Sequence, residues 1–240
     1  MVYTLIIDFD NKAKTKVIVL KPQITESELK EIVDKKKTKY FRRMLKTPKS
    51  HEVHVHSSML VYEPIMLISG KYSANFYRKA SYEINVDSNV KELVFEDGVF
   101  PATNFTPSSS FATKLKNNSV SIKLEEHVFV SHEDELVIDH HGKIRDFKYK
   151  VHNNDIENYP KRILKKNTVK DFEITEEAAA KKLILSLQSH EKFDDVRDLQ
   201  ENMSIDRMTK VYIPIFEARL IGPKRKVEIL RYDAVKRKLL

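Results

Sequence analysis

Two stretches of this 240-residue chain combine residue types that bind divalent metals. In HEVHVH, at 51–56, side chains of a strand would alternate between two faces, so Glu52, His54 and His56 would share one face and the valines the other. A carboxylate and two imidazoles can hold a divalent transition metal. An exposed polar face above buried valines gives the same pattern, and no further acid or histidine is placed to complete a site. We therefore expect an exposed face, and a metal-dependent hydrolase is the residual enzymatic hypothesis.

The second stretch, LVIDHHG at 136–142, resembles the Asp-His-His signature of manganese-dependent phosphoesterases. Those enzymes also carry an upstream histidine with paired aspartates and a downstream glycine-rich histidine motif. Asp8 and Asp10 follow no histidine, and a chain with four glycines cannot supply the second motif. The alternative is a hairpin turn, with aspartate at its first position and Gly142 where φ is positive. The sequence favours the turn.

Composition excludes further classes of chemistry. Cysteine is absent, which removes disulfides, thiolate zinc sites and cysteine nucleophiles. Phosphate-cradling loops need several close glycines, which this chain lacks. We expect a protein that is not an enzyme, with no catalytic residue, no metal ligand and no cofactor.

A basic run carries the main functional prediction. The stretch KKKTKYFRRMLKTPK, at 35–49, holds eight Lys or Arg and no acid, in a chain of net charge +8. Cations neutralise phosphates, and the embedded aromatics could stack on bases, although we expect them to be buried beneath a solvated helix face. Basic groups at 161–166, 224–226 and 236–238 would extend the surface if the fold brings them together. The predicted contacts are Lys35, Lys36, Lys37, Lys39, Arg42, Arg43 and Lys46.

These features predict a non-enzymatic binding protein that recognises nucleic acid or a ribonucleoprotein such as the ribosome. The alternative is a protein-interaction, assembly or regulatory module that binds a polypeptide through an exposed sheet edge or a linker. The first residues show no basic leader, and no window approaches the roughly 18 apolar residues of a membrane span. The expected location is the cytoplasm.

Local patterns predict both helices and strands. Thr25, followed three residues later by Glu28, is a capping box, so one helix or two short ones should lie within 26–46. A second helix is expected at 176–188, with a shorter helical piece near 194–203. Runs of β-branched and aromatic residues predict an opening hairpin at 3–9 and 16–20, several strands within 51–100, and strands at 127–131, 135–138, 144–151, 211–221 and 226–233.

A repeated motif indicates internal duplication. VYEPI at 61–65 returns as VYIPI at 211–215, and the same offset of 150 lays ITE at 24–26 on ITE at 174–176. The stretch equivalent to the basic run, 185–199, is not basic, so a shared fold does not require that cluster. The proline of each motif lacks an amide hydrogen and should sit at an edge, at a bulge or where a strand enters the sheet.

The second copy holds ITEEAAAKKLILSL, VYIPIFEARLIG and VEILRYDAV, and over about 70 residues it resembles PepSY-like helix-strand-strand modules. Those begin with a Thr/Ser-Glu-Glu-Ala helix and end in a strand carrying Asp-Ala. Lys236 and Arg237 replace their usual Thr-Gly turn, and the export signal of these mostly extracytoplasmic modules is absent. The resemblance implies a helix-plus-sheet fold and a role in regulating peptidases.

The expected fold class is therefore α+β, with two related helix-plus-antiparallel-sheet units at offset 150 and additional β-hairpins. Residues 1–100 would hold the opening hairpin and the first unit. Residues 101–122, rich in proline and small polar residues, would form a flexible linker or loop, and 123–240 would hold further hairpins and the second unit.

Overall fold

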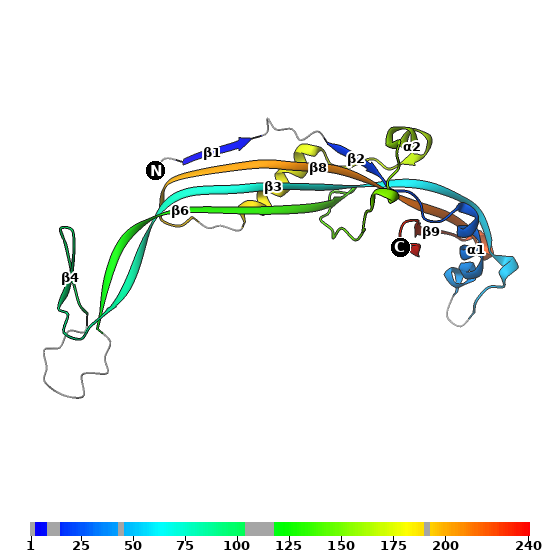
Figure 1. Ribbon diagram of the computed structural model, residues 1–240. Coiled ribbons are helices and arrows are strands. Elements are labelled where there is room, and N and C mark those ends of the chain that lie inside the picture. Colours follow the sequence, from blue (N-terminus) through cyan, green and yellow to red (C-terminus); the bar gives the residue numbers. More distant parts are fainter. Residues whose placement is uncertain (1–2, 9–14, 43–45, 104–117, 190–192) are drawn as a thin grey trace. The chain divides into compact units, whose positions relative to one another are not determined.

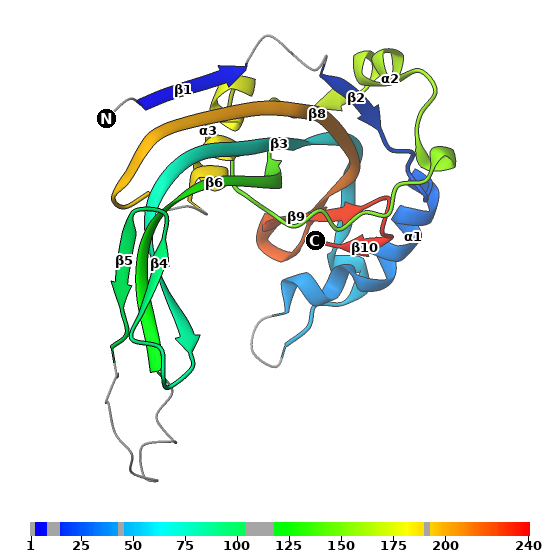
Figure 2. The same ribbon diagram turned by 60° about the vertical axis from the view of Figure 1, so that its left-hand side comes forward.

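An eight-stranded sheet dominates the fold, and a separate two-stranded sheet accompanies it (Figures 1 and 2). The computed structural model describes residues 3–8, 15–42, 46–103, 118–189 and 193–240. Among these residues, helices and mostly antiparallel strands occur together, which confirms the α+β class. The centre of the predicted linker, 104–117, lies outside the described residues.

The strands of the large sheet follow the order β10-β9-β8-β3-β6, with β1 and β2 also paired to β8 and β7 paired to β3. Their bounds are β1 Tyr3–Asp8, β2 Lys16–Val19, β3 His54–Val86, β6 Asn118–Asp139, β7 Thr168–Val169, β8 Val196–Ile221, β9 Val227–Asp233 and β10 Lys238–Leu239. The small sheet is the hairpin of β4 (Glu92–Phe95) and β5 (Gly98–Pro101). The helices are α1 Glu26–Lys36, α2 Pro160–Lys166 and α3 Glu176–Gln188, with 3₁₀ helices η1 Lys37–Phe41, η2 Ser50–Glu52, η4 Asn153–Asp155 and η5 Pro223–Arg225.

The chain divides into two units, each assembled from three separate segments. Unit 1 comprises Met1–Ile7, Tyr72–His132 and Ser189–Met203, and unit 2 comprises Asp8–Lys71, Glu133–Gln188 and Ser204–Leu240. The sequence-based division at 101–122 assumes contiguous domains, whereas β3, β6 and β8 each contribute residues to both units.

The expected opening hairpin is wrong. β1 and β2 do not pair with each other; both pair with β8, and β2 does so in parallel from Lys16↔Thr209 to Val19↔Tyr212. An alternating apolar pattern indicates a strand but carries no information about which strand will be its neighbour.

The helical piece near 194–203 is also wrong, because this stretch begins β8. Val196, Leu199 and Met203 are buried, a spacing that suits a helix. Asp198 has a positive φ of 54°, and this local change shifts the alternation so that Val196 and Leu199 are both buried in one strand. The apolar spacing that suggested a helix therefore results from a backbone irregularity in a strand.

Residues 144–151 form no strand, although alternation predicted one. The segment makes a single bridge, Ile144 with Ile138, and otherwise runs without ladder pairing. Phe147, Tyr149 and Val151 pack against a buried cluster on one sheet face, formed by Leu20, Val211, Ile213 and Ile215. The alternation of residue types therefore arises because every second side chain is buried against the sheet face, without the hydrogen bonds of a strand.

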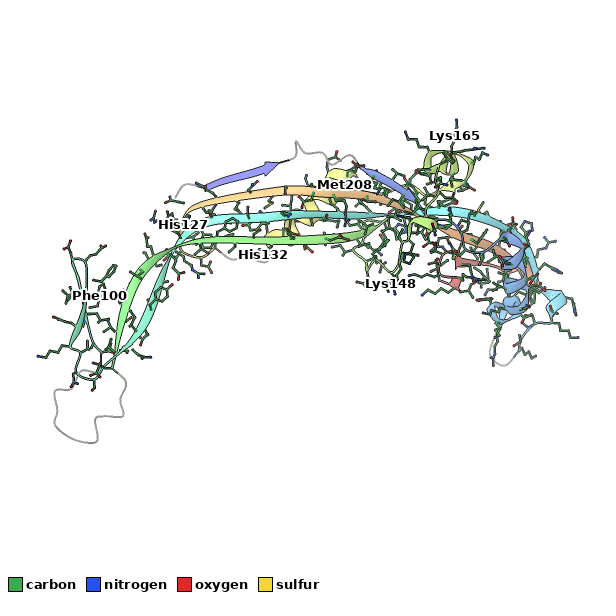
Figure 3. The ribbon with its side chains drawn as sticks, in the orientation of Figure 1. Phe100, His127, His132, Lys148, Lys165 and Met208 are labelled. Carbon is green, nitrogen blue, oxygen red and sulfur yellow. The ribbon has the colours of Figure 1, made fainter. Side chains whose placement is uncertain are left out.

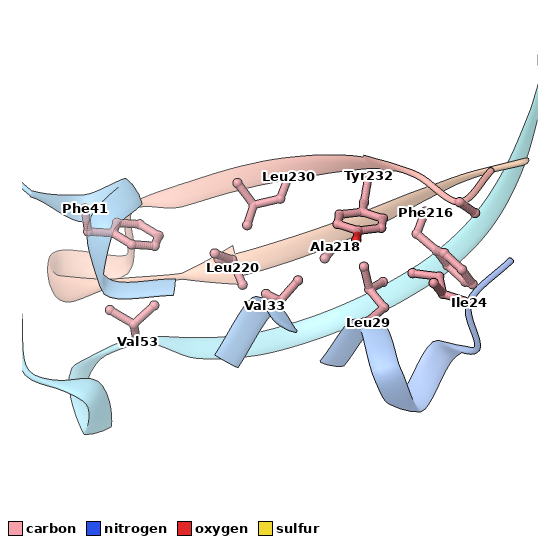
Figure 4. Packing of buried hydrophobic residues seen from close by; sticks show 11 residues of the cluster. Ile24, Leu29, Val33, Phe41, Val53, Phe216, Ala218, Leu220, Leu230 and Tyr232 are labelled. Atoms are coloured by element: carbon pink, nitrogen blue, oxygen red, sulfur yellow. The ribbon is translucent and has the colours of Figure 1, made fainter. Parts of the chain in front are cut away.

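The capping box predicted for α1 is present. Thr25 Oγ1 accepts from the amide of Glu28 at 3.3 Å, and the Glu28 carboxylate accepts from the amide of Thr25 at 2.7 Å. Leu29 and Val33 then face the apolar side chains of β8 and β9, including Tyr232 (Figure 4). The cap fixes where α1 begins, and this packing fixes which face it buries.

Several contacts in unit 2 recur at an offset of 150. Thr175 Oγ1 accepts from the amide of Ala178 at 3.2 Å at the start of α3, as Thr25 does for α1. β7 pairs in parallel with β3 at Val61↔Thr168 and Tyr62↔Val169, matching β2 on β8. Beyond each short strand the amides of Leu20 and Lys170 bond to the carbonyls of Tyr212 (3.0 Å) and Tyr62 (2.9 Å).

The repeated prolines lie at the ends of these parallel ladders. In such a ladder the residue two positions after the acceptor Tyr212 would donate back to Leu20, and that residue is Pro214, which has no amide hydrogen. Pro64 stands in the same relation to Tyr62. From Ile215 onward β8 pairs with β9, so Pro214 sits inside a long strand where one neighbour is exchanged for another. The expectation of an edge or an entry point is replaced by this arrangement.

Candidate functional site

The predicted basic contacts lie at the end of α1, along η1 and just beyond it. Lys37 is buried, and its Nζ lies 2.6 Å from Asp34 Oδ1, so it is neutralised within the protein. Arg43 lies outside the described residues. The exposed members are Lys35, Lys36, Lys39, Arg42 and Lys46, and no carboxylate among the described residues forms an ion pair with any of them.

The switch from α-helix to 3₁₀ helix explains this exposure. With three residues per turn, η1 presents Phe41 to the core and leaves Lys39 outside. Phe41 is buried and packs so closely on Gly222 that a Cβ there would overlap its ring. Tyr40 is also partly buried in this cluster. The aromatics of the basic run are therefore core residues, as expected, and are not available to stack on bases.

One of the three additional basic groups lies beside this segment. Lys226 Nζ is 5.8 Å from the centroid of the Phe41 ring, which places the turn containing η5 next to η1. Lys226 itself pairs with Glu228, whereas Lys224 and Arg225 are exposed and form no ion pair with a described carboxylate. Lys165, on α2, belongs to a separate segment (Figure 3).

The HEVHVH stretch has the expected exposed polar residues above valines that are buried or partly buried, but only 54–56 lie in a strand. Glu52 ends the 3₁₀ helix η2, and its carboxylate accepts from the amide of Lys49 at 2.6 Å. His54 and His56 are exposed in β3, and Val53 is fully buried. Across the part of the chain that the structure describes, no group of three or more acidic or histidine side chains is arranged to hold a metal ion.

The stretch at 139–142 is a turn, as predicted. Gly142 donates to the carbonyl of Asp139 at 2.9 Å and has a φ of 80°. One carboxylate oxygen of Asp139 accepts from the amides of His141 (3.1 Å) and Lys143 (2.9 Å). His141 Nδ1 lies 2.7 Å from a carboxylate oxygen of Glu173.

Sequence reasoning missed a cluster of four charged side chains on the sheet of unit 2, which we call the Glu63 cluster. It comprises Glu63 on β3, Lys170 after β7, Glu217 on β8 and Arg231 on β9. Lys170 Nζ lies 2.6 Å from Glu63 and 3.3 Å from Glu217, and Arg231 bonds to Glu63 and approaches Glu217 at 3.4 Å.

The Glu63 cluster is ionised and internally neutralised. Burial would raise the pKa of Glu63, but the hydrogen bond from Lys170 and the charges of Arg231 and Lys170 hold that pKa below its ordinary value. Burial acts to lower the pKa of Lys170, and its bonds to Glu63 and Glu217 raise it overall. A carboxylate with a lowered pKa is poorly suited to act as a proton donor near neutral pH, so we assign the cluster to structure.

A signal for this cluster was present in the repeat. Glu63 is the one residue in which VYEPI differs from VYIPI, where Ile213 is buried in an apolar cluster. A charged residue in the place of a buried aliphatic one indicates that opposite charges lie nearby.

No protein-family model, curated protein or solved structure matches the chain. The resemblance to PepSY-like modules therefore stays a prediction. Among the described residues, none of the helices has the length and apolar character needed to cross a lipid bilayer.

Proposed function

We propose that this protein is a non-enzymatic binder of nucleic acid or of a ribonucleoprotein, and that the exposed cations of 35–46 contact phosphates. The observation that carries the proposal is that Lys35, Lys36, Lys39, Arg42 and Lys46 are exposed without a carboxylate partner among the described residues. Cations of this kind are already in solvent and can neutralise phosphates while releasing condensed counterions.

The fold accounts for only part of this charge. Lys35 and Lys36 lie in the last turn of α1, where the helix dipole favours cations. Lys39, Arg42 and Lys46 lie beyond that turn, so the helix dipole does not explain their presence. Lys224 and Arg225, on the neighbouring turn, would enlarge the contact surface.

The proposal also draws on internal duplication, which we propose for the two halves at offset 150. The recurrent caps and parallel pairings support it, since independent halves have no reason to make the same bonds at one offset. In the second half, the residues equivalent to the basic run include His190 through Lys192, outside the described part, and Asp194 and Asp195, which are acidic. A feature that one copy has and the other lacks is then a candidate for function.

The test compares two double charge reversals. Lys36→Glu with Lys39→Glu changes the proposed surface, and Lys181→Glu with Lys182→Glu makes the same change of net charge on α3. Binding to single-stranded and duplex RNA and DNA is measured by fluorescence anisotropy at several salt concentrations. For the wild type, the logarithm of the binding constant should fall linearly with the logarithm of the salt concentration. For the Lys36→Glu and Lys39→Glu variant, this slope should be less steep by about one for each phosphate contact removed.

Equal losses in the two variants would show that net charge alone attracts the polyanion. Absence of binding by the wild type at low salt would refute the proposal. The absorbance ratio at 260 and 280 nm of protein purified at low salt gives an independent measurement of bound nucleic acid, because the chain has no tryptophan.

The alternative, a module that binds a polypeptide, is supported by a specific observation in unit 1. The β4–β5 hairpin exposes Val94, Phe95 and Val99, each with more than half of its surface accessible. An isolated two-stranded hairpin is marginally stable in water, and contiguous exposed apolar groups often mark an interaction site. A pull-down after nuclease treatment tests it: a partner lost on Val94→Asp with Phe95→Asp, but retained by the Lys36→Glu and Lys39→Glu variant, would favour this function.

A further inference from the structure

The segment after β6 and the turn after β9 form a pocket in unit 2, away from the basic run in the sequence. Residues 145–149 run extended over the sheet, with Phe147 and Tyr149 directed toward its apolar cluster. Because side chains alternate along an extended chain, Lys148 between them is exposed (Figure 3). The aromatic side chains thus anchor the segment and direct a lysine outward.

The opposite wall of the pocket is held by Asp233. One of its carboxylate oxygens accepts from the amides of Val235 (2.9 Å) and Lys236 (2.8 Å), and the other accepts from the Tyr149 hydroxyl at 2.8 Å. Asp233 is 1% exposed, so its charge is committed to these three donors. They fix the backbone of Lys236, whose Nζ lies 4.1 Å from the centroid of the Tyr149 ring.

The lining of the pocket is dominated by cations. Its volume is about 610 Å³, and its polar lining residues are Arg145, Lys148, Lys236, Lys238, Asp146 and Asp233. Arg145 Nε is occupied by Asp139 at 3.0 Å. Within the described part of the chain, no carboxylate forms an ion pair with Lys148, Lys236 or Lys238, and the lining holds four cations against the carboxylates of Asp146 and Asp233.

These lysines also act on one another. Burial lowers the pKa of Lys236; the charge of Asp233 raises it, and the charges of Lys238 and Lys148 lower it further. Like charges that converge on one pocket repel each other, and a bound anion would relieve that repulsion. The backbone of one lysine is already fixed by the turn, so binding would order fewer groups than at a mobile surface.

We propose that this pocket binds the phosphate group of a small phosphorylated ligand, with the ammonium groups of Lys148, Lys236 and Lys238 donating to its oxygens. A phosphate offers several strong acceptors and a double negative charge, which matches three ammonium groups better than a carboxylate would. The ring of Tyr149 and the side chains of Ile65, Ile144 and Leu240 supply an apolar surface for the remainder of the ligand. The proposal uses none of the residues of 35–46, and it assigns Lys236 and Lys238 of the basic group 236–238 to this pocket.

The test is calorimetric titration of the full chain with inorganic phosphate and with pyrophosphate, at constant ionic strength set by sodium chloride. Lys236→Ala and Lys148→Ala should each weaken pyrophosphate binding about tenfold, the size of one charge-assisted hydrogen bond. The matched control is Lys150→Ala, which removes an exposed lysine two residues from Lys148 that does not line the pocket. It should change affinity less than twofold.

Two results would overturn the proposal: no heat of binding with either anion at millimolar concentration, or an equal loss in the Lys150→Ala variant. Thermal unfolding of each variant shows whether the fold is kept. Since Lys148 is exposed, that variant tests the proposal even if Lys236→Ala is unstable. The Lys36→Glu and Lys39→Glu variant should keep its affinity for pyrophosphate whatever happens to its affinity for RNA, which separates the two proposals.

Discussion

Glu63→Ile should destabilise the protein, because it removes the nearer of the two carboxylates that both cations of the Glu63 cluster contact. Breaking a buried pair typically costs about 3–5 kcal/mol, whereas an exposed pair contributes about 0–1 kcal/mol. The Glu63 side chain is 13% exposed, but those of Lys170 and Arg231 are 34% and 36% exposed, so solvent screens part of the loss. We expect a decrease of roughly 2 kcal/mol in the free energy of unfolding.

Urea denaturation followed by circular dichroism measures this change. At about 2 kcal/mol per molar urea, the unfolding midpoint should fall by roughly 1 M. The pKa of Glu63 is lower in the folded chain than its ordinary value, so its contribution is present above pH about 4.3 and is lost as pH falls through the folded pKa. The difference between wild type and variant should therefore shrink at the acidic end of the range.

A fourfold replacement distinguishes the cost of burying charged groups from the cost of leaving a cation without its carboxylate partner. Replacing all four charged residues with aliphatic ones leaves no cation unpaired, and such replacements are often neutral or stabilising. The proposed duplication supplies three of the choices, since Ile213, Leu20 and Leu67 lie at offset 150 from Glu63, Lys170 and Glu217, and valine is the aliphatic replacement at 231. The variant is Glu63→Ile, Lys170→Leu, Glu217→Leu and Arg231→Val, and it should recover most of the stability that Glu63→Ile loses. A neutral Glu63→Ile, or a fourfold variant less stable than it, would refute this account of the cluster.

Four further substitutions test local features by urea or thermal denaturation. Thr25→Ala should cost about 1 kcal/mol through loss of the helix cap. Thr175→Ala should cost less, because the Thr175 hydroxyl accepts a single bond of 3.2 Å and no reciprocal glutamate bond accompanies it among the described contacts; a larger loss for Thr175 would contradict this. Gly70→Ala should destabilise by about 1–3 kcal/mol, since its Cβ would overlap the carbonyl oxygen of Ser204, and an unchanged midpoint would show that the strands can separate without loss. Tyr149→Phe should cost about 1 kcal/mol through loss of the hydroxyl bond to a buried carboxylate, with no loss expected if that hydroxyl is instead hydrated.

Features set by neighbouring residues could be predicted from the sequence. The cap of α1 and the turn at Asp139 depend on side chains within four residues of the bonds they make. The strand at 226–233 was predicted within one residue of β9 for the same reason, since local β-propensity and a nearby turn define it. Such elements are encoded by short-range interactions.

Partners distant in the sequence could not be predicted. β2 lies parallel to β8 almost 200 residues later, and nothing in its four residues specifies that neighbour. The lysines of the pocket come from two segments, around Lys148 and Lys236, that only the fold brings together. In the basic run, residue type alone does not distinguish Lys37, which is paired and buried, from its exposed neighbours.

The prolines at the ends of the parallel ladders restrict how the sheet can misfold. A strand that slid along β8 by two residues would need a donor at 214, and Pro214 has none. The restriction applies from both directions, because β2 approaches that position from one side and β9 from the other. A single residue therefore discriminates against register errors in two strands that are more than 200 residues apart in the sequence.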